Sequence, residues 1–93
     1  MTSPTYPLIV EIYTKDYCPY CTKAKMLFNQ LNIDYTEIDL TSDPDAMDTL
    51  QARRPGARTV PQIFIGNQPI GGCDDLYALH ERGELLPLLA PTT

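Results

Sequence analysis

The sequence lacks any apolar run close to the roughly 18 residues that a membrane-spanning helix requires. Its first residues, "MTSPTYP", have no basic region followed by an apolar block, so they do not indicate a secretory leader. The two absences favour a soluble protein of the cytoplasm that does not use a membrane as a partner.

Basic residues and cysteines are also scarce. Seven Lys and Arg stand against twelve Asp and Glu, which gives a formal net charge of −5. This balance disfavours a broad surface for nucleic acid or for an anionic membrane. Three cysteines are too few, and odd in number, for the disulfide framework of a small secreted protein. Reduced thiols in a reducing compartment fit this composition better.

Internal repeats, low-complexity runs and long linkers are missing as well, and the nine prolines and five glycines are scattered along the chain. A chain of 93 residues with 43% hydrophobic content is large enough for one small core. We therefore predict a single domain over residues 1–93, with a core of about 8–90.

The first half of the chain predicts a strand, a helix and a second strand. The segment 8–14, "LIVEIYT", is rich in β-branched and aromatic residues, and 35–40, "YTEIDL", has the same character. Between them, apolar residues from Cys21 onward recur at helical spacing, and Pro19 suits the first turn of that helix. A unit of this length predicts a right-handed parallel crossover.

The second half predicts a helix, a hairpin and a last helix. "SDPDAMDTLQARR" offers Ser42 or Asp43 as a cap, and Pro55-Gly56 stops the helix. "PQIFI" and "GNQPI" predict two short antiparallel strands around a Gly66-Asn67 turn. Asp74 or Asp75 can cap the last helix and Gly83 can end it. The fold class is therefore α/β, a four-stranded mixed sheet flanked by three helices in the order β-α-β-α-β-β-α.

Cys18 and Cys21 stand where the first strand gives way to the first helix. An unperturbed cysteine, with a pKa of about 8.5, is only a few per cent ionised at pH 7, yet the thiolate is the nucleophile in disulfide exchange. The unpaired N–H groups and positive dipole end of the helix would stabilise a thiolate at Cys18. Cys21, one turn deeper, would be shielded and could resolve a mixed disulfide formed on Cys18.

Two other interpretations of the pair remain open on the residues alone. Free cysteines are often small, inert core residues. A structural zinc site would need four ligands, and only Cys73 and His80 remain as further cysteine or histidine donors, without a second paired spacing. The position of the pair at a strand-to-helix junction favours redox chemistry over both.

Three motifs in order, "CPYC", "TVPQIFIG" and "GGCDDL", resemble a dithiol glutaredoxin of the small bacterial type, within the thioredoxin superfamily. The resemblance covers roughly Ile9 to Leu89 and implies a thioredoxin-like fold. Thioredoxin itself is disfavoured, because it typically has Gly-Pro between its cysteines and a tryptophan before them, and this chain has no tryptophan.

The resemblance implies a cis peptide bond before Pro61 and a backbone at Val60 that is free to pair with glutathione. It also implies that Asp74 meets the γ-glutamyl ammonium, while Lys15 and Arg53 hold the glycine carboxylate, with Arg58 as a rival to Arg53. The Cys73 thiol is expected to be a bystander. The full set of expected glutathione-binding residues is Lys15, Tyr20, Arg53, Thr59, Val60, Pro61, Gly72, Cys73 and Asp74.

The function that follows is a glutathione-dependent thiol–disulfide oxidoreductase that reduces protein disulfides and glutathione mixed disulfides through Cys18 and Cys21. Its partners would be glutathione and disulfide-containing or glutathionylated proteins. We expect a monomer with no permanently bound cofactor and no metal. The alternative is a glutathione-bridged [2Fe-2S] cluster carrier, although such glutaredoxins more often have "CGFS"-like motifs.

Overall fold

The structure, a computed structural model, describes residues 8–89. The expectation of no leader and the ends of the predicted domain involve residues 1–7 and 90–93, which lie outside this range. The helices and strands, in chain order, are β1 (Val10–Thr14), α1 (Pro19–Gln30), β2 (Thr36–Asp39), α2 (Ala46–Arg53), β3 (Gln62–Ile65), β4 (Gln68–Gly71), α3 (Cys73–Glu81) and α4 (Leu85–Leu89).

The four strands form one mixed sheet in the order β2-β1-β3-β4. β1 and β2 are parallel and are joined through α1, as the strand–helix–strand pattern predicted. β3 runs antiparallel to both β1 and β4. Gly66 and Asn67 both have positive φ, 57° and 68°, in the turn between β3 and β4. The predicted hairpin is therefore confirmed, and its turn has the backbone that two-residue hairpin loops favour.

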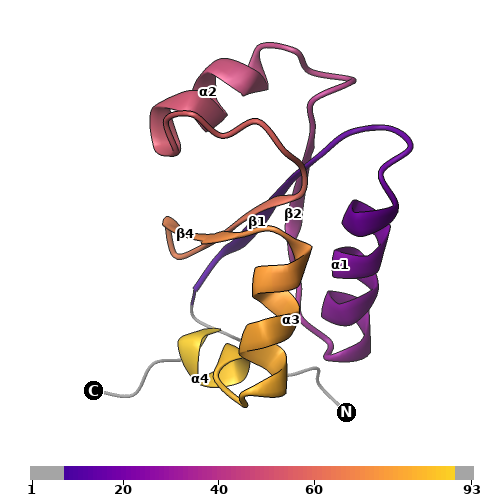
Figure 1. The fold of residues 1–93 in the computed structure, drawn as a ribbon, viewed down its shortest axis with the longest axis vertical. Coiled ribbons are helices and arrows are strands. Elements are labelled where there is room, and N and C mark those ends of the chain that lie inside the picture. Colours follow the sequence, from indigo (N-terminus) through magenta and orange to yellow (C-terminus); the bar gives the residue numbers. More distant parts are fainter. Residues whose placement is uncertain (1–7, 90–93) are drawn as a thin grey trace.

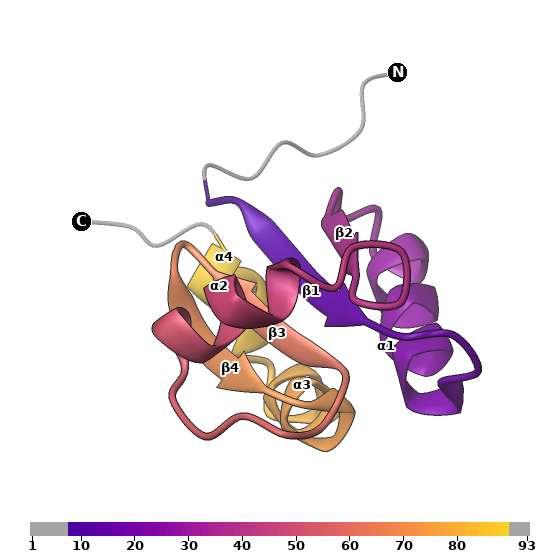
Figure 2. The ribbon, with the colours of Figure 1, turned by 90° about the horizontal axis from the view of Figure 1, so that it is seen from above.

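The sheet separates two apolar cores. Side chains of Val10, Ile12, Ile63 and Ile65 pack on one face with α1, α3 and α4. On the other face Tyr13 and Phe64 pack with α2. Figure 1 shows α1 and α3 on one side of the strands, apart from α2, and Figure 2 shows β1 passing between α2 and α1. Successive side chains of a strand thus pack in opposite cores, as expected for a pleated strand with both faces covered.

Strand pairing brings three separate segments to one end of the sheet. The last residues of β1 lie opposite the first residue of β3, since Tyr13 pairs with Gln62. Gly71, at the end of β4, pairs with Ile63. The segments that follow β1, precede β3 and follow β4 therefore meet, and these are the segments that carry the three sequence motifs.

Residues 8–89 contain four helices rather than the three that were predicted. α4 has the sequence "LLPLL", and the proline at its centre is a residue that usually interrupts helices. Pro87 lies within the first turn, where backbone N–H groups have no partner inside the helix, so the missing N–H costs no hydrogen bond. Leu85 and Leu89, one turn apart, are fully buried in the core with α3 and stabilise this short element.

α2 also begins later than its capping residues predicted. The N–H groups of Ala46, Met47 and Asp48 donate to carbonyls three residues earlier, at 3.1 Å each. These bonds form tight turns that precede the regular helix, so Asp45, without a side-chain cap, is the residue before its first turn. The helix ends at Arg53, and Arg54 already has a non-helical backbone, with φ of −144° and ψ of 87°.

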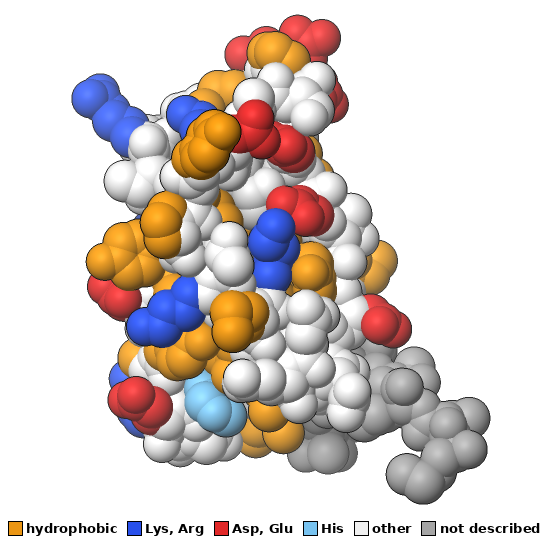
Figure 3. All heavy atoms as spheres, turned by 90° about the vertical axis from the view of Figure 1, so that its right-hand side faces the viewer, with side chains coloured by type: hydrophobic (Ala, Val, Ile, Leu, Met, Phe, Trp, Pro, Cys, Tyr) orange, Lys and Arg blue, Asp and Glu red, His pale blue; other side chains and the backbone are white. Residues whose placement is uncertain are grey.

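The surface carries both signs of charge. Figure 3 shows one face, on which acidic and basic side chains are interspersed with hydrophobic ones. Within residues 8–89 no helix combines the length and the apolar character needed to cross a membrane.

Candidate functional site

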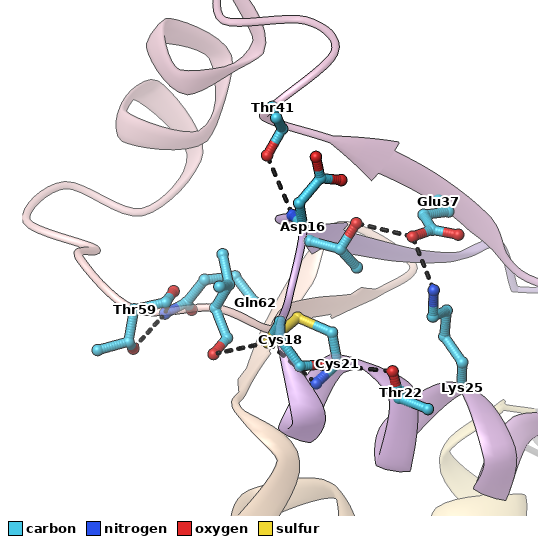
Figure 4. The surroundings of a disulfide bond; sticks show 11 residues. Asp16, Cys18, Cys21, Thr22, Lys25, Glu37, Thr41, Thr59 and Gln62 are labelled. Atoms are coloured by element: carbon cyan, nitrogen blue, oxygen red, sulfur yellow. Dashed lines mark hydrogen bonds and ion pairs between the residues drawn. A yellow bond between two sulfur atoms is a disulfide. The ribbon is translucent and has the colours of Figure 1, made fainter.

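Cys18 and Cys21 form a disulfide at the N-terminus of α1, with Cα atoms 5.1 Å apart (Figure 4). Cys18 is the residue before the first turn and is half-buried, whereas Cys21 is 2% exposed in the core side of the helix. Pro19 occupies the first helical position, where its missing N–H leaves no bond unmade. The pair is thus oxidised, with one sulfur at the surface and one shielded.

Backbone groups surround the Cys18 sulfur. The Cys21 N–H donates to Cys18 Sγ at 3.1 Å, so the sulfur takes the place of a capping oxygen at the helix N-terminus. The first turn of α1 contains no acidic residue. When the disulfide is reduced, an anion on Cys18 meets this N–H and the positive end of the helix dipole, without a nearby first-turn carboxylate.

The loop before β3 faces the same sulfur. The Val60–Pro61 peptide bond is cis, as the resemblance implied. The Val60 carbonyl oxygen lies 3.8 Å from Cys18 Sγ, and in the disulfide form this is a contact without a hydrogen bond, because the sulfur has no proton. No residue in 8–89 accepts a hydrogen bond from the Val60 N–H. This backbone is therefore available to an extended ligand beside Cys18.

A hollow lies on the α3 side of the disulfide, and we call it the cis-proline hollow. Its lining consists of Tyr20, Arg54, Thr59, Val60, Pro61, Gln62, Gly72, Cys73, Asp74 and Asp75. It brings together all the expected glutathione-binding residues except Lys15 and Arg53. Sequence reasoning missed three of the lining residues, Arg54, Gln62 and Asp75.

Asp74 and Asp75 have different roles at the start of α3. The Gly72 N–H donates to the Asp75 carboxylate at 3.0 Å, so Asp75 is the residue that caps the helix. Gly71, with φ of +116°, leaves no room for a side chain, since a Cβ there would overlap the same carboxylate. Asp74 is exposed, and its carboxylate accepts no hydrogen bond within residues 8–89. It is therefore the free acidic group of this hollow.

The Cys73 thiol also lines the cis-proline hollow but is buried. Burial raises the pKa of this thiol, and the nearby Lys23 opposes the rise only partly. A neutral buried thiol is a poor nucleophile, which agrees with the bystander expected from the sequence.

A second hollow lies on the other side of the disulfide, and we call it the β2-side hollow. Its lining consists of Lys15, Asp16, Tyr17, Cys18, Pro19, Cys21, Thr22, Lys25, Glu37 and Asp39. Lys15 lies here, exposed, rather than in the cis-proline hollow. Figure 4 shows the Lys25 side chain pointing toward Glu37. Thr14 and Lys25 donate to Glu37 Oε2 at 2.7 and 2.9 Å. The Lys25 hydrogen bond, and after it that of Thr14, lowers the pKa of Glu37.

Arg53 does not reach either hollow. Its guanidinium donates to Glu11 at 2.8 Å, to the Tyr13 hydroxyl at 3.2 Å and to Asn67 at 3.0 Å. It also stacks 4.0 Å from the ring centroid of Phe64. The bond to Glu11 is the main reason why the pKa of Arg53 is raised. The sequence predicted that Arg53 would hold the glycine carboxylate of glutathione. In the structure its side chain instead joins α2 to the sheet.

The remaining sequence candidates lie at the surface. Arg58 is exposed and lines neither hollow, and His80 is exposed near the end of α3. In the described part of the chain, no three His, Cys, Asp or Glu side chains gather in a way that could hold a metal ion.

Comparisons with known proteins agree with this geometry. The family model described as Glutaredoxin matches residues 10–70. Glutaredoxin 3 of Escherichia coli is 50% identical over 80 residues, which cover 86% of this chain and 95% of that protein. A probable glutaredoxin of Synechocystis is 49% identical over 81 residues, covering 87% of this chain and 74% of the relative.

Solved structures give the same result. A buckwheat glutaredoxin–glutathione complex has a TM-score of 0.77 and 42% identity, covering 88% of this chain and 76% of that one. A glutaredoxin from Brucella melitensis has a TM-score of 0.76 and 45% identity, covering 92% of each chain. The family model, the sequence identities and the structural matches show that the chain belongs to the glutaredoxin family.

Proposed function

We propose that this protein is a glutathione-dependent thiol–disulfide oxidoreductase that reduces protein disulfides and glutathione mixed disulfides. The observation that carries the proposal is the Cys18 sulfur, which receives an N–H bond at a helix N-terminus and lies beside the free backbone of Val60. The buckwheat relative, whose structure is described as a complex with glutathione, supports the choice of co-substrate.

The reaction begins with both cysteines reduced. The Cys18 thiolate attacks the glutathione sulfur of a mixed disulfide, and the substrate thiolate leaves and takes a proton. A second glutathione thiolate then attacks the glutathione bound to Cys18, which releases glutathione disulfide and restores the Cys18 thiolate. The net reaction converts the mixed disulfide and one free glutathione into the substrate thiol and glutathione disulfide.

Protein disulfides need the second cysteine. Attack by Cys18 leaves a mixed disulfide with the substrate protein, and the Cys21 thiolate displaces the substrate by attacking Cys18 Sγ. The product is the Cys18–Cys21 disulfide of this structure. Two glutathione molecules reduce it again and leave as glutathione disulfide.

Recognition uses charges around the disulfide. We assign the γ-glutamyl ammonium of glutathione to Asp74 and the adjacent carboxylate to the N–H groups at the start of α3. The Val60 backbone pairs with the central part of the tripeptide, between the walls formed by Tyr20, Thr59, Pro61, Gly72 and Cys73. Lys15 faces the glycine end from the other side of Cys18. Arg53 is left out of this assignment, because Glu11 already neutralises it.

The proposal includes action as a monomer in the cytoplasm. All the groups assigned above come from one chain, and the cytoplasmic glutathione pool is poised to reduce a disulfide of this type. The alternative of a glutathione-bridged [2Fe-2S] carrier is not favoured, because Pro19 and Tyr20 depart from the "CGFS"-like pattern and Cys21 closes a disulfide with Cys18.

A coupled assay tests the proposal. A glutathionylated peptide, glutathione, glutathione reductase and NADPH are combined, and NADPH consumption reports the release of glutathione disulfide. We expect turnover that depends on Cys18. Absence of turnover by the wild-type protein would refute the proposed function, and an iron–sulfur absorbance spectrum from the anaerobically purified protein would favour the alternative.

A further inference from the structure

Two adjacent arginines at the end of α2 have opposite electrostatic surroundings. Arg53 is paired with the Glu11 carboxylate at 2.8 Å. Arg54 donates through Nη1 to the side-chain carbonyl of Gln62, at 2.7 Å, and this acceptor is neutral. Among residues 8–89 Arg54 forms no ion pair. The bond to Gln62 therefore holds the Arg54 side chain in place, and no carboxylate of residues 8–89 pairs with its positive charge.

The amide of Gln62 connects Arg54 to the loop that faces Cys18. Gln62 is only 4% exposed, at the start of β3. Its nitrogen donates to the Thr59 carbonyl at 2.8 Å and to the Thr59 hydroxyl at 3.2 Å, while its oxygen accepts from Arg54. The buried Gln62 amide thus bonds to Arg54 through its oxygen and to Thr59 through its nitrogen. It thereby holds the end of α2 beside Thr59, the residue before Val60.

The cis-proline hollow consequently has unlike charges on its two walls. Arg54 stands on the wall formed by Thr59 and Gln62, and Asp74 stands on the wall formed by the start of α3. The α3 wall lies close to the loop, since a Cβ at Gly72 would be 3.5 Å from the Pro61 carbonyl oxygen. A guanidinium has five N–H donors, so Arg54 keeps free donors after its bond to Gln62.

We propose that Arg54 is a specificity-determining cation for the glycine carboxylate of glutathione, and that Gln62 is the positioning residue that holds it there without neutralising it. This inference rests on the proposed function and adds two residues to it. A glutamate at position 62 could keep the contact with Arg54 but would pair its charge, as Glu11 pairs that of Arg53. The neutral amide is therefore a functional requirement and not only a structural one.

The test compares two substrates that differ in one charge. One is a peptide in mixed disulfide with glutathione, and the other carries glutathione whose glycine carboxylate is an ethyl ester. The ratio of their kcat/KM values measures recognition of that carboxylate. Arg54→Gln removes the cation, and Gln62→Glu neutralises it. Arg53→Gln is the control for loss of an arginine from the same helix end.

A second control separates charge from loop structure. Gln51 also holds the loop after α2, because its side chain donates to the Ala57 carbonyl and accepts from the Gly56 N–H at 3.0 Å. It forms no hydrogen bond with Arg54, so Gln51→Glu repeats the chemical change of Gln62→Glu at another anchor of the loop. A structural effect alone would change both glutamine variants in the same way.

We expect the wild-type protein to prefer the acid over the ester by roughly fivefold, the size of one partly exposed charge contact. Arg54→Gln and Gln62→Glu should both reduce this preference to the part that Lys15 contributes, and the two controls should keep it in full. If the wild-type protein shows no preference, or if Arg54→Gln retains it in full, the inference is wrong. Should Gln62→Glu fail to fold, Arg54→Gln against Arg53→Gln still decides. No turnover of either substrate by the wild-type protein would instead refute the proposed function.

Discussion

The two hollows beside the disulfide differ in how their charged groups are satisfied. In the β2-side hollow Lys25 pairs with Glu37, and the Thr41 N–H bonds to Asp39 at 2.8 Å. In the cis-proline hollow Arg54 has a neutral partner, and Asp74 has none within residues 8–89. Charges that already satisfy one another contribute to the fold, whereas charges without partners are available to a ligand. With the exception of Lys15, the comparison assigns stability mainly to the β2-side hollow and recognition mainly to the cis-proline hollow.

The largest expected effect removes the Cys18 sulfur, which lines the β2-side hollow and contacts the Val60 carbonyl of the cis-proline hollow. Cys18→Ser should abolish every thiol-transfer activity. Cys21→Ser should retain reduction of glutathione mixed disulfides, because external glutathione releases the bound glutathione without a second protein thiol. The coupled assay with a glutathionylated peptide and with a protein disulfide measures this difference. Equal loss in both variants on the glutathionylated peptide would contradict the division of labour between the cysteines.

The next effect concerns the surroundings of the two sulfurs in the reduced protein. Cys18 has the helix N-terminus and solvent access, whereas Cys21 is buried. We expect iodoacetamide to alkylate Cys18 at least about tenfold faster than Cys21 at neutral pH. Mass spectrometry of peptides after timed quenching measures both rates. Comparable rates at the two cysteines would show that burial and the helix end do not separate them.

Asp74→Asn should have a smaller effect, confined to glutathione-containing substrates. Loss of one partly exposed charge contact costs about 1 kcal/mol, which is roughly fivefold in kcat/KM. A small disulfide without a glutathione group should react at nearly the wild-type rate. Asp48→Asn, the same change at an exposed position in the first turn of α2, is the control. If Asp74→Asn slows both substrates equally, Asp74 has a structural role and the cis-proline hollow loses its acidic ligand group.

The smallest effect tests the β2-side hollow. The pKa of Glu37 is lowered in the folded protein, so its stabilising contribution is present above the ordinary glutamate pKa and is lost as the pH falls through the lowered value. Glu37→Gln should reduce the free energy of unfolding by less than about 1 kcal/mol at neutral pH, because the pair is partly exposed. Urea denaturation at neutral pH and at pH values below the lowered pKa should show the difference disappearing.

The activity of Glu37→Gln gives a second test of the difference between the two hollows. Glu37→Gln should leave the acid-to-ester preference for glutathione substrates unchanged. A selective loss of that preference would mean that Glu37, in addition to Lys15, takes part in recognising the glycine carboxylate. Stability that differs from the wild-type protein equally at all pH values would mean that ionisation of Glu37 is not the cause.

Features with a local cause were predictable from the sequence. The cysteines at a strand-to-helix junction, the Gly66-Asn67 hairpin turn and the end of α3 near Gly83 follow from short-range backbone preferences. The cis bond before Pro61 came from the resemblance to glutaredoxins. These features fix where the cis-proline hollow forms, because strand pairing then brings their segments together.

The charged residues of the hollow were harder to predict. Arg53 is the last residue of α2 and faces the sheet, whereas Arg54 has a non-helical backbone and its side chain bonds to Gln62 beside the loop. Neighbouring helical residues point about 100° apart. An error of one residue in the predicted end of α2 therefore exchanges the arginine that faces the sheet with the arginine that faces the loop. The late start of α2 and the packing of Arg53 on Phe64 depend on tertiary contacts that no local pattern contains.

The two glycines before α3 differ in how freely the chain could vary there. Gly71 combines a positive φ with a Cβ direction that is filled by the Asp75 carboxylate, so any replacement would disturb both the strand end and the helix cap. Gly72 has an ordinary φ of −97° and space for a methyl group in van der Waals contact with the Pro61 carbonyl. A library randomised at both codons and selected for folded, active protein should thus retain only glycine at position 71. At position 72 it should also admit alanine, whose methyl group would narrow the cis-proline hollow.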